Sequence, residues 1–265
     1  MKLRDVLFAL ASAALLLPAC TNTPARSQDP NAPQPLRVGV SGHNPPLIYE
    51  AGRGKFDGVE ATFATMLGQE LGRPVQFVQM PFDKLIPAVQ RGEVDILMSG
   101  MTVFAQRKTL VDFTSPYMVS GQALLVRSAN ASNFEDPRIL YLTAYRIGVE
   151  KGSVGNVLAQ RVNPNSTVVQ YSTPAKAADA LRAGKVDVVI HDAPVLWRLT
   201  ADNPTAGTLV IPNLLAKETL AWAVRRGDTT LLKQANAALA KWRANGTLNR
   251  TLRTYMPNYD IIERL

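Results

Sequence analysis

Cysteine and histidine are scarce in this 265-residue chain, which contains one cysteine, Cys20, and two histidines, His43 and His191. A single cysteine excludes an intramolecular disulfide, and so few sulfur and imidazole groups disfavour a structural metal site. We therefore expect neither a bound metal nor a cofactor.

Clusters of positive charge are also missing, although the formal net charge is +8. The basic residues are spread out, and only short pairs such as Arg107-Lys108 and Arg225-Arg226 occur. Nucleic-acid-binding proteins usually gather basic residues in clusters with aromatic residues between them. We therefore expect a solvated basic surface and no nucleic-acid partner. A composition of 46% hydrophobic and 19% charged residues is otherwise typical of globular proteins.

The first twenty residues differ in character from the rest of the chain. Two basic residues near the start precede an apolar run over 6–17. This run is too short for an ordinary membrane span and is typical of a secretory signal peptide, which we place at residues 1–20. Residues 21–35 are rich in Pro, Asn, Thr and Ser and have no apolar period, so they predict a flexible tether.

The end of the signal segment resembles the lipobox of bacterial lipoproteins, because Leu17-Pro18-Ala19 directly precedes Cys20. This resemblance implies cleavage before Cys20 and a lipid anchor on its thiol, at the periplasmic or outer surface of a bacterial membrane. The alternative is an ordinary signal peptide with an incidental cysteine.

Two stretches of the chain repeat one pattern of strand, helix and strand. Their closing strands are nearly continuous apolar runs, as is typical of parallel strands covered on both faces. The pattern therefore predicts two similar α/β lobes. The predicted elements are a strand over 75–80, a helix over 82–90 and a strand over 94–98, and then a strand over 167–171, a helix over 174–183 and a strand over 186–190.

The segments outside the repeat complete the first lobe. Residues 36–41 predict a strand and 58–71 a helix, because apolar residues recur there at strand and helix spacing. Residues 220–226 and a predicted helix over 229–244 have no counterpart in the second repeat, so we expect them to return to the first lobe. Lobe 1 then comprises 36–118 and 219–265, and lobe 2 comprises 119–218.

Polar residues follow the closing strand of each repeat, where α/β proteins usually place their ligand sites. Arg107 can bind a carboxylate through two hydrogen bonds, and Asp192 can bind an ammonium group. An α-amino acid carries both groups on one carbon. The candidate residues are Ser99, Gly100, Thr102 and Arg107 after the first strand, and His191 and Asp192 after the second.

Residues 82–117, FDKLIPAVQRGEVDILMSGMTVFAQRKTLVDFTSPY, resemble a known family, and so do HDAPV (191–195) and AALAKWRANGTLNR (237–250). The chain is similar over about 36–257 to the bacterial extracytoplasmic solute-binding proteins of family 3, the polar amino acid receptors of ABC importers. This resemblance implies an α/β fold of the periplasmic-binding-protein-like type II class, with two lobes joined by two hinge strands.

The resemblance also implies roles for individual residues. Arg107 would bind the ligand's α-carboxylate with help from Thr102, Ser99 and Gly100, and Asp192 would bind its α-ammonium. Phe82 would pack on the ligand, and Ser153 would add a hydrogen bond from the turn over 150–154. Glu150 occupies a position whose residue usually faces the ligand side chain in this family. It would favour a ligand with a cationic or amide side chain. His191 is a further candidate contact.

Several of these residues have an alternative role that is purely structural. Arg107 could sit in a surface ion pair, which contributes little stability. Asp192 could cap the helix that starts near Ala193-Pro194, and Phe82 could simply pack in the core. His191 could line the site without binding the ligand. Phe104 has no assigned role.

We expect a monomeric receptor that hands a small amino acid-like ligand to an ABC transporter permease. The alternative is an enzyme on the same scaffold, similar to the cyclohexadienyl dehydratases that act on prephenate or arogenate. Such an enzyme needs a general acid, for which Glu218 and Glu150 are candidates. A third possibility is a sensory or peptidoglycan-associated module that acts through a partner.

Overall fold

The computed structural model describes residues 33–257 and 259. The predicted signal peptide with Cys20, and tether residues 21–32, lie outside the described residues. Within the described ranges, none of the helices combines the length and the apolar character that crossing a membrane requires.

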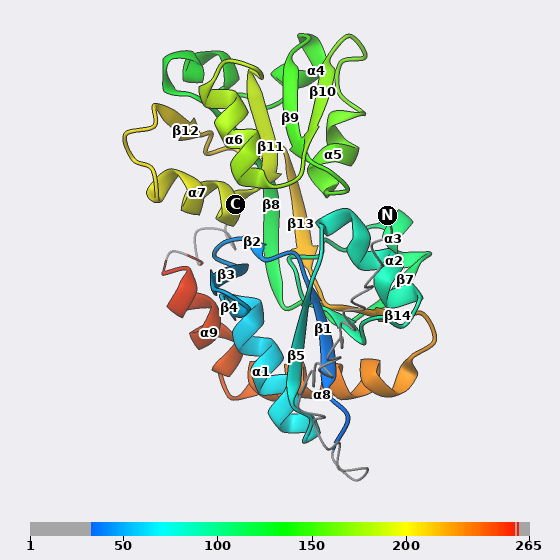
Figure 1. Ribbon diagram of the computed structural model, residues 1–265. Helices are drawn as coiled ribbons and strands as arrows, with labels where there is room; N and C mark the ends of the chain where they lie inside the picture. Colours follow the sequence, from blue (N-terminus) through cyan, green and yellow to red (C-terminus); the bar gives the residue numbers. More distant parts are fainter. Residues whose placement is uncertain (1–32, 258, 260–265) are drawn as a thin grey trace, which may run out of the picture. The chain divides into compact units, whose positions relative to one another are not determined.

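The first sheet has the strand order β5-β1-β6-β14-β7. Strand β1 pairs in parallel with β5 and β6, whereas β14 is antiparallel to both of its neighbours. The C-terminal strand β14 therefore lies inside a sheet that the N-terminal strands begin (Figure 1). The strands are β1 (Leu36–Val40), β5 (Val75–Gln79), β6 (Ile96–Leu97), β7 (Val111–Phe113) and β14 (Ala223–Arg225).

The second sheet has the order β10-β9-β11-β8-β12, and β13 also pairs with β8. Its parallel part is β10-β9-β11, and β8 is antiparallel to β11, β12 and β13. The strands are β8 (Met118–Arg127), β9 (Arg146–Glu150), β10 (Thr167–Tyr171), β11 (Val188–Asp192), β12 (Thr208–Val210) and β13 (Ala216–Leu220). A small third sheet is formed by β2 (His43–Asn44), β3 (Ile48–Gly52) and β4 (Lys55–Asp57).

Helices cover both large sheets, and apolar side chains alternate between the two faces of the central strands. In β8, Ala123 and Leu125 join one core cluster while Leu124 and Val126 join another. The helices are α1 (Val59–Leu71), α2 (Leu85–Gln90), α3 (Ala105–Lys108), α4 (Ile139–Leu142), α5 (Val154–Ala159), α6 (Pro174–Arg182), α7 (Ala193–Ala201), α8 (Thr229–Ala244) and α9 (Thr247–Tyr255). Short 3-10 segments are η1 (Phe82–Lys84) and η2 (Ser128–Phe134).

An aromatic cluster joins the C-terminal helix α8 to the first sheet. The ring of Trp242 in α8 stacks on Phe63 of α1 with centroids 5.6 Å apart, and Phe63 also contacts Trp222 just before β14. Large aromatic side chains bury much apolar surface when they pack in this way. The cluster therefore fastens the returning C-terminal segment to the N-terminal strands.

Two antiparallel strands connect the two sheets. β8 begins at Met118, and its first residues pair with β13 in a register that runs from Met118 with Leu220 to Gln122 with Ala216. Figure 1 shows β8 and β13 side by side between the two halves of the structure. Thr102 forms an isolated bridge with Leu220, so the loop after β6 is attached to the start of this connection.

The predicted elements exist, but some of their bounds differ. The strand predicted over 186–190 is β11, Val188–Asp192, because the ladder with β8 continues past the apolar run to Asp192. The helix predicted over 82–90 is a 3-10 turn followed by α2. The strand predicted over 94–98 shortens to Ile96–Leu97, where it pairs with β1.

Candidate functional site

The guanidinium of Arg107 is held between the two halves of the structure. Arg107 lies in the short helix α3, and its Nη1 donates to the carbonyl oxygen of Thr102 at 3.1 Å. Its Nη2 donates to the carbonyl oxygen of Gly152 at 3.0 Å, in the turn between β9 and α5. A guanidinium has five N–H donors, so these two bonds leave others for a ligand.

Arg107 is 4% exposed, which excludes the surface ion pair considered above. Burial lowers the pKa of Arg107 to about 10, against the raising effect of Asp192, Glu218 and Glu150. The side chain therefore remains a cation at neutral pH. Its Cζ lies 4.8 Å from the ring centroid of Phe104 and 5.4 Å from that of Phe82, both within cation–π range. Phe104, which had no assigned role, thus packs against the guanidinium.

The backbone N–H and carbonyl groups of Thr102 point to the side on which the guanidinium of Arg107 lies. Thr102 and Leu220 are a bridge pair whose bonds run from Val103 N–H to Thr219 and from Ala221 N–H to Met101. In such a pair, the N–H and carbonyl of the central residue point away from the partner strand. The Thr102 carbonyl accepts from Arg107, so its N–H points to the same side as the guanidinium.

Gly100 joins the first half of the structure to Asp192. Its φ of 66° lies in the left-handed region, which glycine adopts without strain. A Cβ there would lie 3.9 Å from Asp192 Oδ2 and 3.0 Å from Leu47 Cδ1. Gly100 therefore allows the carboxylate of Asp192 to come close to the loop after β6.

The hydroxyl groups of two predicted site residues make hydrogen bonds within their own half. Ser99 Oγ accepts from the backbone N–H of Ser41 and donates to its Oγ, both at 2.9 Å. Ser153 is the N-cap of α5, and its Oγ accepts from the N–H of Asn156 at 3.1 Å. Both hydroxyls thus position the backbone turns that carry the site.

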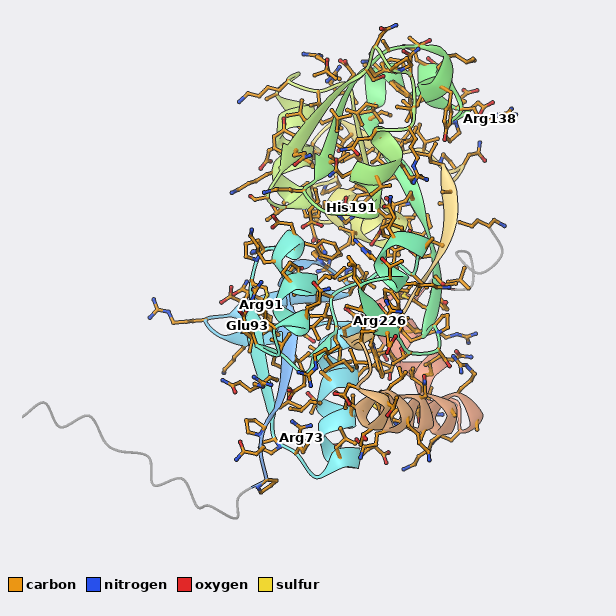
Figure 2. The ribbon with its side chains drawn as sticks, turned by 90° about the vertical axis from the view of Figure 1, so that its right-hand side faces the viewer. Arg73, Arg91, Glu93, Arg138, His191 and Arg226 are labelled. Atoms are coloured by element: carbon orange, nitrogen blue, oxygen red, sulfur yellow. The ribbon has the colours of Figure 1, made fainter. Side chains whose placement is uncertain are left out.

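A row of polar side chains crosses four neighbouring strands of the second sheet, near the first half of the structure. Glu150 ends β9, His191 and Asp192 end β11, Gln122 lies in β8, and Glu218 lies in β13. The order β9-β11-β8, with β13 beside β8, places these residues next to one another. Figure 2 shows His191 at the end of the second sheet that faces the first.

Gln122 connects two carboxyl groups of this row. Its Nε2 donates to Glu218 Oε1 at 2.8 Å and also to Asp192 Oδ1. Asp192 occupies the N-cap position of α7, but its side chain makes no capping hydrogen bond. The carboxylate is therefore free of the structural role that the sequence allowed, and lies beside Gly100 and Glu218.

Glu218 stays protonated more readily than an ordinary glutamate. Burial raises the pKa of Glu218 well above its usual range, and the charge of Asp192 and a hydrogen bond to it act in the same direction. Hydrogen bonds from Gln122 and Thr102 oppose the shift. The protonated form of Glu218 is thus favoured beside Asp192.

Glu150 and His191 form a second buried pair. Glu150 Oε2 lies 3.1 Å from His191 Nε2, and each residue is 2% exposed. Burial acts to lower the pKa of His191, but the hydrogen bond to Glu150 and the charge of Asp192 outweigh it and raise the pKa above its usual value. The imidazolium form of His191 is therefore favoured more than in an ordinary histidine.

Three buried polar atoms of the row lack a hydrogen-bond partner among the described residues. They are Gln122 Oε1, Glu150 Oε1 and His191 Nδ1. A buried polar group without a partner costs about 1–3 kcal/mol. A ligand that supplied these partners would recover this free energy, so the row is suited to binding a polar molecule.

Glu60 is a buried carboxyl behind the site, in the first turn of α1. Its Oε2 accepts from the N–H of Gly100 at 2.5 Å, and Glu60 is 0% exposed. Burial raises the pKa of Glu60 to about 8, although Tyr117 and the Gly100 N–H act to lower it. The residue therefore holds the glycine that lies beside Asp192.

The two halves of the structure touch around the predicted site. Besides the Arg107 bond to Gly152, Lys151 Nζ lies 3.1 Å from Asp83 Oδ2. A Cβ on Gly152 would lie only 2.8 Å from the Cβ of Asp83. The turn after β9 is thus packed directly against the segment that carries Phe82.

The structure gathers Arg107, Thr102, Gly100, Asp192 and Phe82 in one region, with Glu150 and His191 in the adjoining row. Sequence reasoning missed Gln122 and Glu60 and did not place Glu218 beside Asp192. Gln122 had a signal, because it interrupts an apolar strand. Glu60 had none, because an acid in the first turn of a helix usually needs no further explanation.

Two α/β lobes connected by two antiparallel strands are consistent with the two-lobed fold of periplasmic amino acid-binding proteins. The family model of bacterial extracellular solute-binding proteins, family 3, matches residues 36–258, and the chain belongs to this family. The L-arginine-binding protein of Pseudomonas aeruginosa is 31% identical in a 254-residue alignment that covers 93% of each chain.

Solved structures resemble the chain along most of its length. An ancestral arginine-binding protein bound to arginine is 31% identical with a TM-score of 0.79, covering 85% of this chain and 99% of that one. The ancestral amino acid-binding protein AncCDT-1, described as a precursor of cyclohexadienyl dehydratase, is 31% identical with a TM-score of 0.76. It covers 83% of this chain and 94% of its own.

We predict that Glu60→Gln makes the stability of the protein less dependent on pH. A carboxyl whose pKa is about 8 when folded contributes stability that is fully present below its ordinary pKa and lost as the pH rises to 8. Each pKa unit corresponds to about 1.4 kcal/mol. Gln keeps an acceptor for Gly100 N–H but cannot ionise.

The measurement is the free energy of unfolding by denaturant between about pH 5 and pH 8.5. Relative to the variant, the wild type is expected to lose stability as the pH rises. Glu93→Gln, which removes an exposed carboxylate, should follow the wild type. A difference between wild type and Glu60→Gln that stays constant with pH would contradict the assignment.

Proposed function

We propose that this solute-binding protein is an extracytoplasmic receptor that captures an amino acid between its two lobes and delivers it to an ABC importer. The observation that carries the proposal is the buried guanidinium of Arg107 opposite the carboxylate of Asp192. A zwitterion can satisfy both charges at once, because its carboxylate and ammonium share one carbon. The family match supports the transport role.

The α-carboxylate would bind the free donors of Arg107 and the N–H of Thr102, and the ammonium would bind Asp192. Phe82 would pack beside the bound carbon. Glu150, held by His191, would accept a hydrogen bond from a cationic or amide side chain. That part of the proposal agrees with relatives named as binding arginine and with an ancestral relative solved with glutamine.

The lobes would be 36–118 with 219–265, and 119–218, hinged where β8 and β13 connect the sheets. Ligand contacts that reach both lobes exist only when the lobes are together, so binding would shift the population toward that state. One chain supplies all the proposed contacts, so the proposed site needs no second subunit.

We predict that Arg107→Ala abolishes binding of every amino acid that the wild type binds. L-arginine, L-histidine, L-glutamine and L-cystine are the first compounds to test, by thermal shift and then by calorimetry. A ligand at about 100 times its dissociation constant adds about 2.7 kcal/mol of stability. Arg107→Lys should bind weakly, because an ammonium group cannot reproduce the two parallel hydrogen bonds of a guanidinium.

Arg91→Ala is the matched control, because Arg91 is an exposed arginine of the same lobe that pairs with Glu93. Figure 2 shows Arg91 and Glu93 together on the first half of the structure, away from His191. This variant should bind as the wild type does. Undiminished affinity of a folded Arg107→Ala variant would refute the carboxylate assignment.

A second candidate function is a dehydratase that acts on prephenate or arogenate. One specific feature favours it, namely that burial and the charge of Asp192 raise the pKa of Glu218 well above its usual range, as suits a general acid. The likeness to a precursor of cyclohexadienyl dehydratase also supports it. We expect no turnover, because the similar curated proteins are named as amino acid-binding proteins.

The test is incubation of the protein with prephenate and with arogenate, followed by absorbance for the aromatic product. Rapid turnover that Glu218→Gln removes would establish the enzyme and refute the receptor. Binding of an amino acid without turnover is the expected result.

We further propose that the mature protein is lipid-anchored through Cys20 to a bacterial membrane. The support is the lipobox-like sequence before the only cysteine of the chain. Cys20→Ser should move the protein from the membrane fraction to the soluble extracytoplasmic fraction of expressing cells. A variant that stays with the membrane would contradict the anchor.

A further inference from the structure

Two carboxyl groups, those of Asp192 and Glu218, lie together at the proposed ammonium site, and only Asp192 has a proposed role in binding. Asp192 ends β11, and Glu218 lies in β13 on the other side of β8. Gln122 of β8 donates to both through one nitrogen, at 2.8 Å to Glu218 and also to Asp192. That nitrogen has only two hydrogens, so both are used and the two carboxyls are held together.

The charged groups around this pair come from several elements. Arg107 in α3 is attracted by Asp192, Glu218 and Glu150. The charge of Asp192 acts to raise the pKa of the adjacent His191 and of Glu60 in α1. Thr102 donates a hydrogen bond to Glu218, and the neighbouring Lys217 is exposed. Only one of these cations, Arg107, is already assigned to the ligand carboxylate.

Gln122 Nε2 donates to both carboxyls, and a hydrogen bond between Asp192 and Glu218 favours the protonated form of Glu218. Burial and the charge of Asp192 raise the pKa of Glu218 accordingly. A positive group of a ligand could neutralise this pair in place of a proton.

We propose that Glu218 is a second binding residue for the ligand's ammonium group, and that this ammonium displaces the one proton that Glu218 and Asp192 share. The inference rests on the proposed function. An ammonium group has three donors, enough for Asp192, Glu218 and one further acceptor. The charge balances, because the pair goes from one negative charge to two while one positive ligand group enters and one proton leaves to solvent.

This exchange gives the site a preference for amines. A hydroxy acid with the same carboxylate would still bind Arg107, but it brings no charge to replace the proton. It would therefore bind without proton release and more weakly. The affinity of an amino acid should rise with pH between the ordinary pKa of a glutamate and the raised pKa of Glu218, by at most about tenfold per pH unit.

The experiment is calorimetry of the purified protein with L-glutamine and with L-arginine, each near neutral pH in phosphate and in Tris. These buffers differ in their heat of protonation, so the difference in binding heat counts the protons released. We expect about one proton per ligand for the wild type and for Glu93→Gln, which removes an exposed carboxylate far from the site. Glu218→Gln should release none, and its affinity should change little with pH.

The outcomes separate the two proposals. Binding of either amino acid with the same heat in both buffers overturns this inference alone, and so does unchanged proton release from a folded Glu218→Gln variant. L-histidine and L-cystine replace the first two probes if neither binds. Failure of all four amino acids to bind refutes the proposed function, and this inference with it.

Discussion

Burying the guanidinium of Arg107 costs free energy unless its donors meet acceptors from the surrounding protein or from a ligand. In this structure the acceptors are two carbonyl groups, one from each half: Thr102 near the end of β6 and Gly152 after β9. The rings of Phe104 and Phe82 add favourable contacts within the first half. Because one acceptor comes from each half, the position of Arg107 depends on how the halves sit together. A ligand carboxylate would strengthen the same arrangement with charge.

The acids opposite Arg107 are arranged so that few of their charges are left without a counter-charge. Glu150 is paired with His191, burial and the charge of Asp192 raise the pKa of Glu218, and burial raises the pKa of Glu60 to about 8. This leaves Asp192 as the carboxylate that most needs a cation, and it lies near Gly100 and within the field of Arg107. The arrangement therefore favours a ligand that brings one negative and one positive group close together.

Much of the fold could be predicted from the sequence, since the repeated pattern at 75–98 and 167–190 depends on local periodicity. The return of the elements after Leu220 to the first half could also be predicted, because these elements have no counterpart in the second repeat. The extension of β11 to Asp192 could not be predicted, because two polar residues normally end an apolar strand. They continue it here through pairing with Ala123 and Gln122 of β8, a strand more than sixty residues earlier.

The site was predictable where a residue's chemistry is unusual by itself, and not where it depends on a distant neighbour. Arg107 and Asp192 follow buried strands, which is a local signal. Gln122 gains its importance from two carboxyls that lie 70 and 96 residues further along the chain. The raised pKa of Glu218 likewise follows from its burial and from the charge of Asp192, which only the meeting of β8, β11 and β13 brings close. Charge regulation in this site is therefore a property of the assembled strands rather than of any motif.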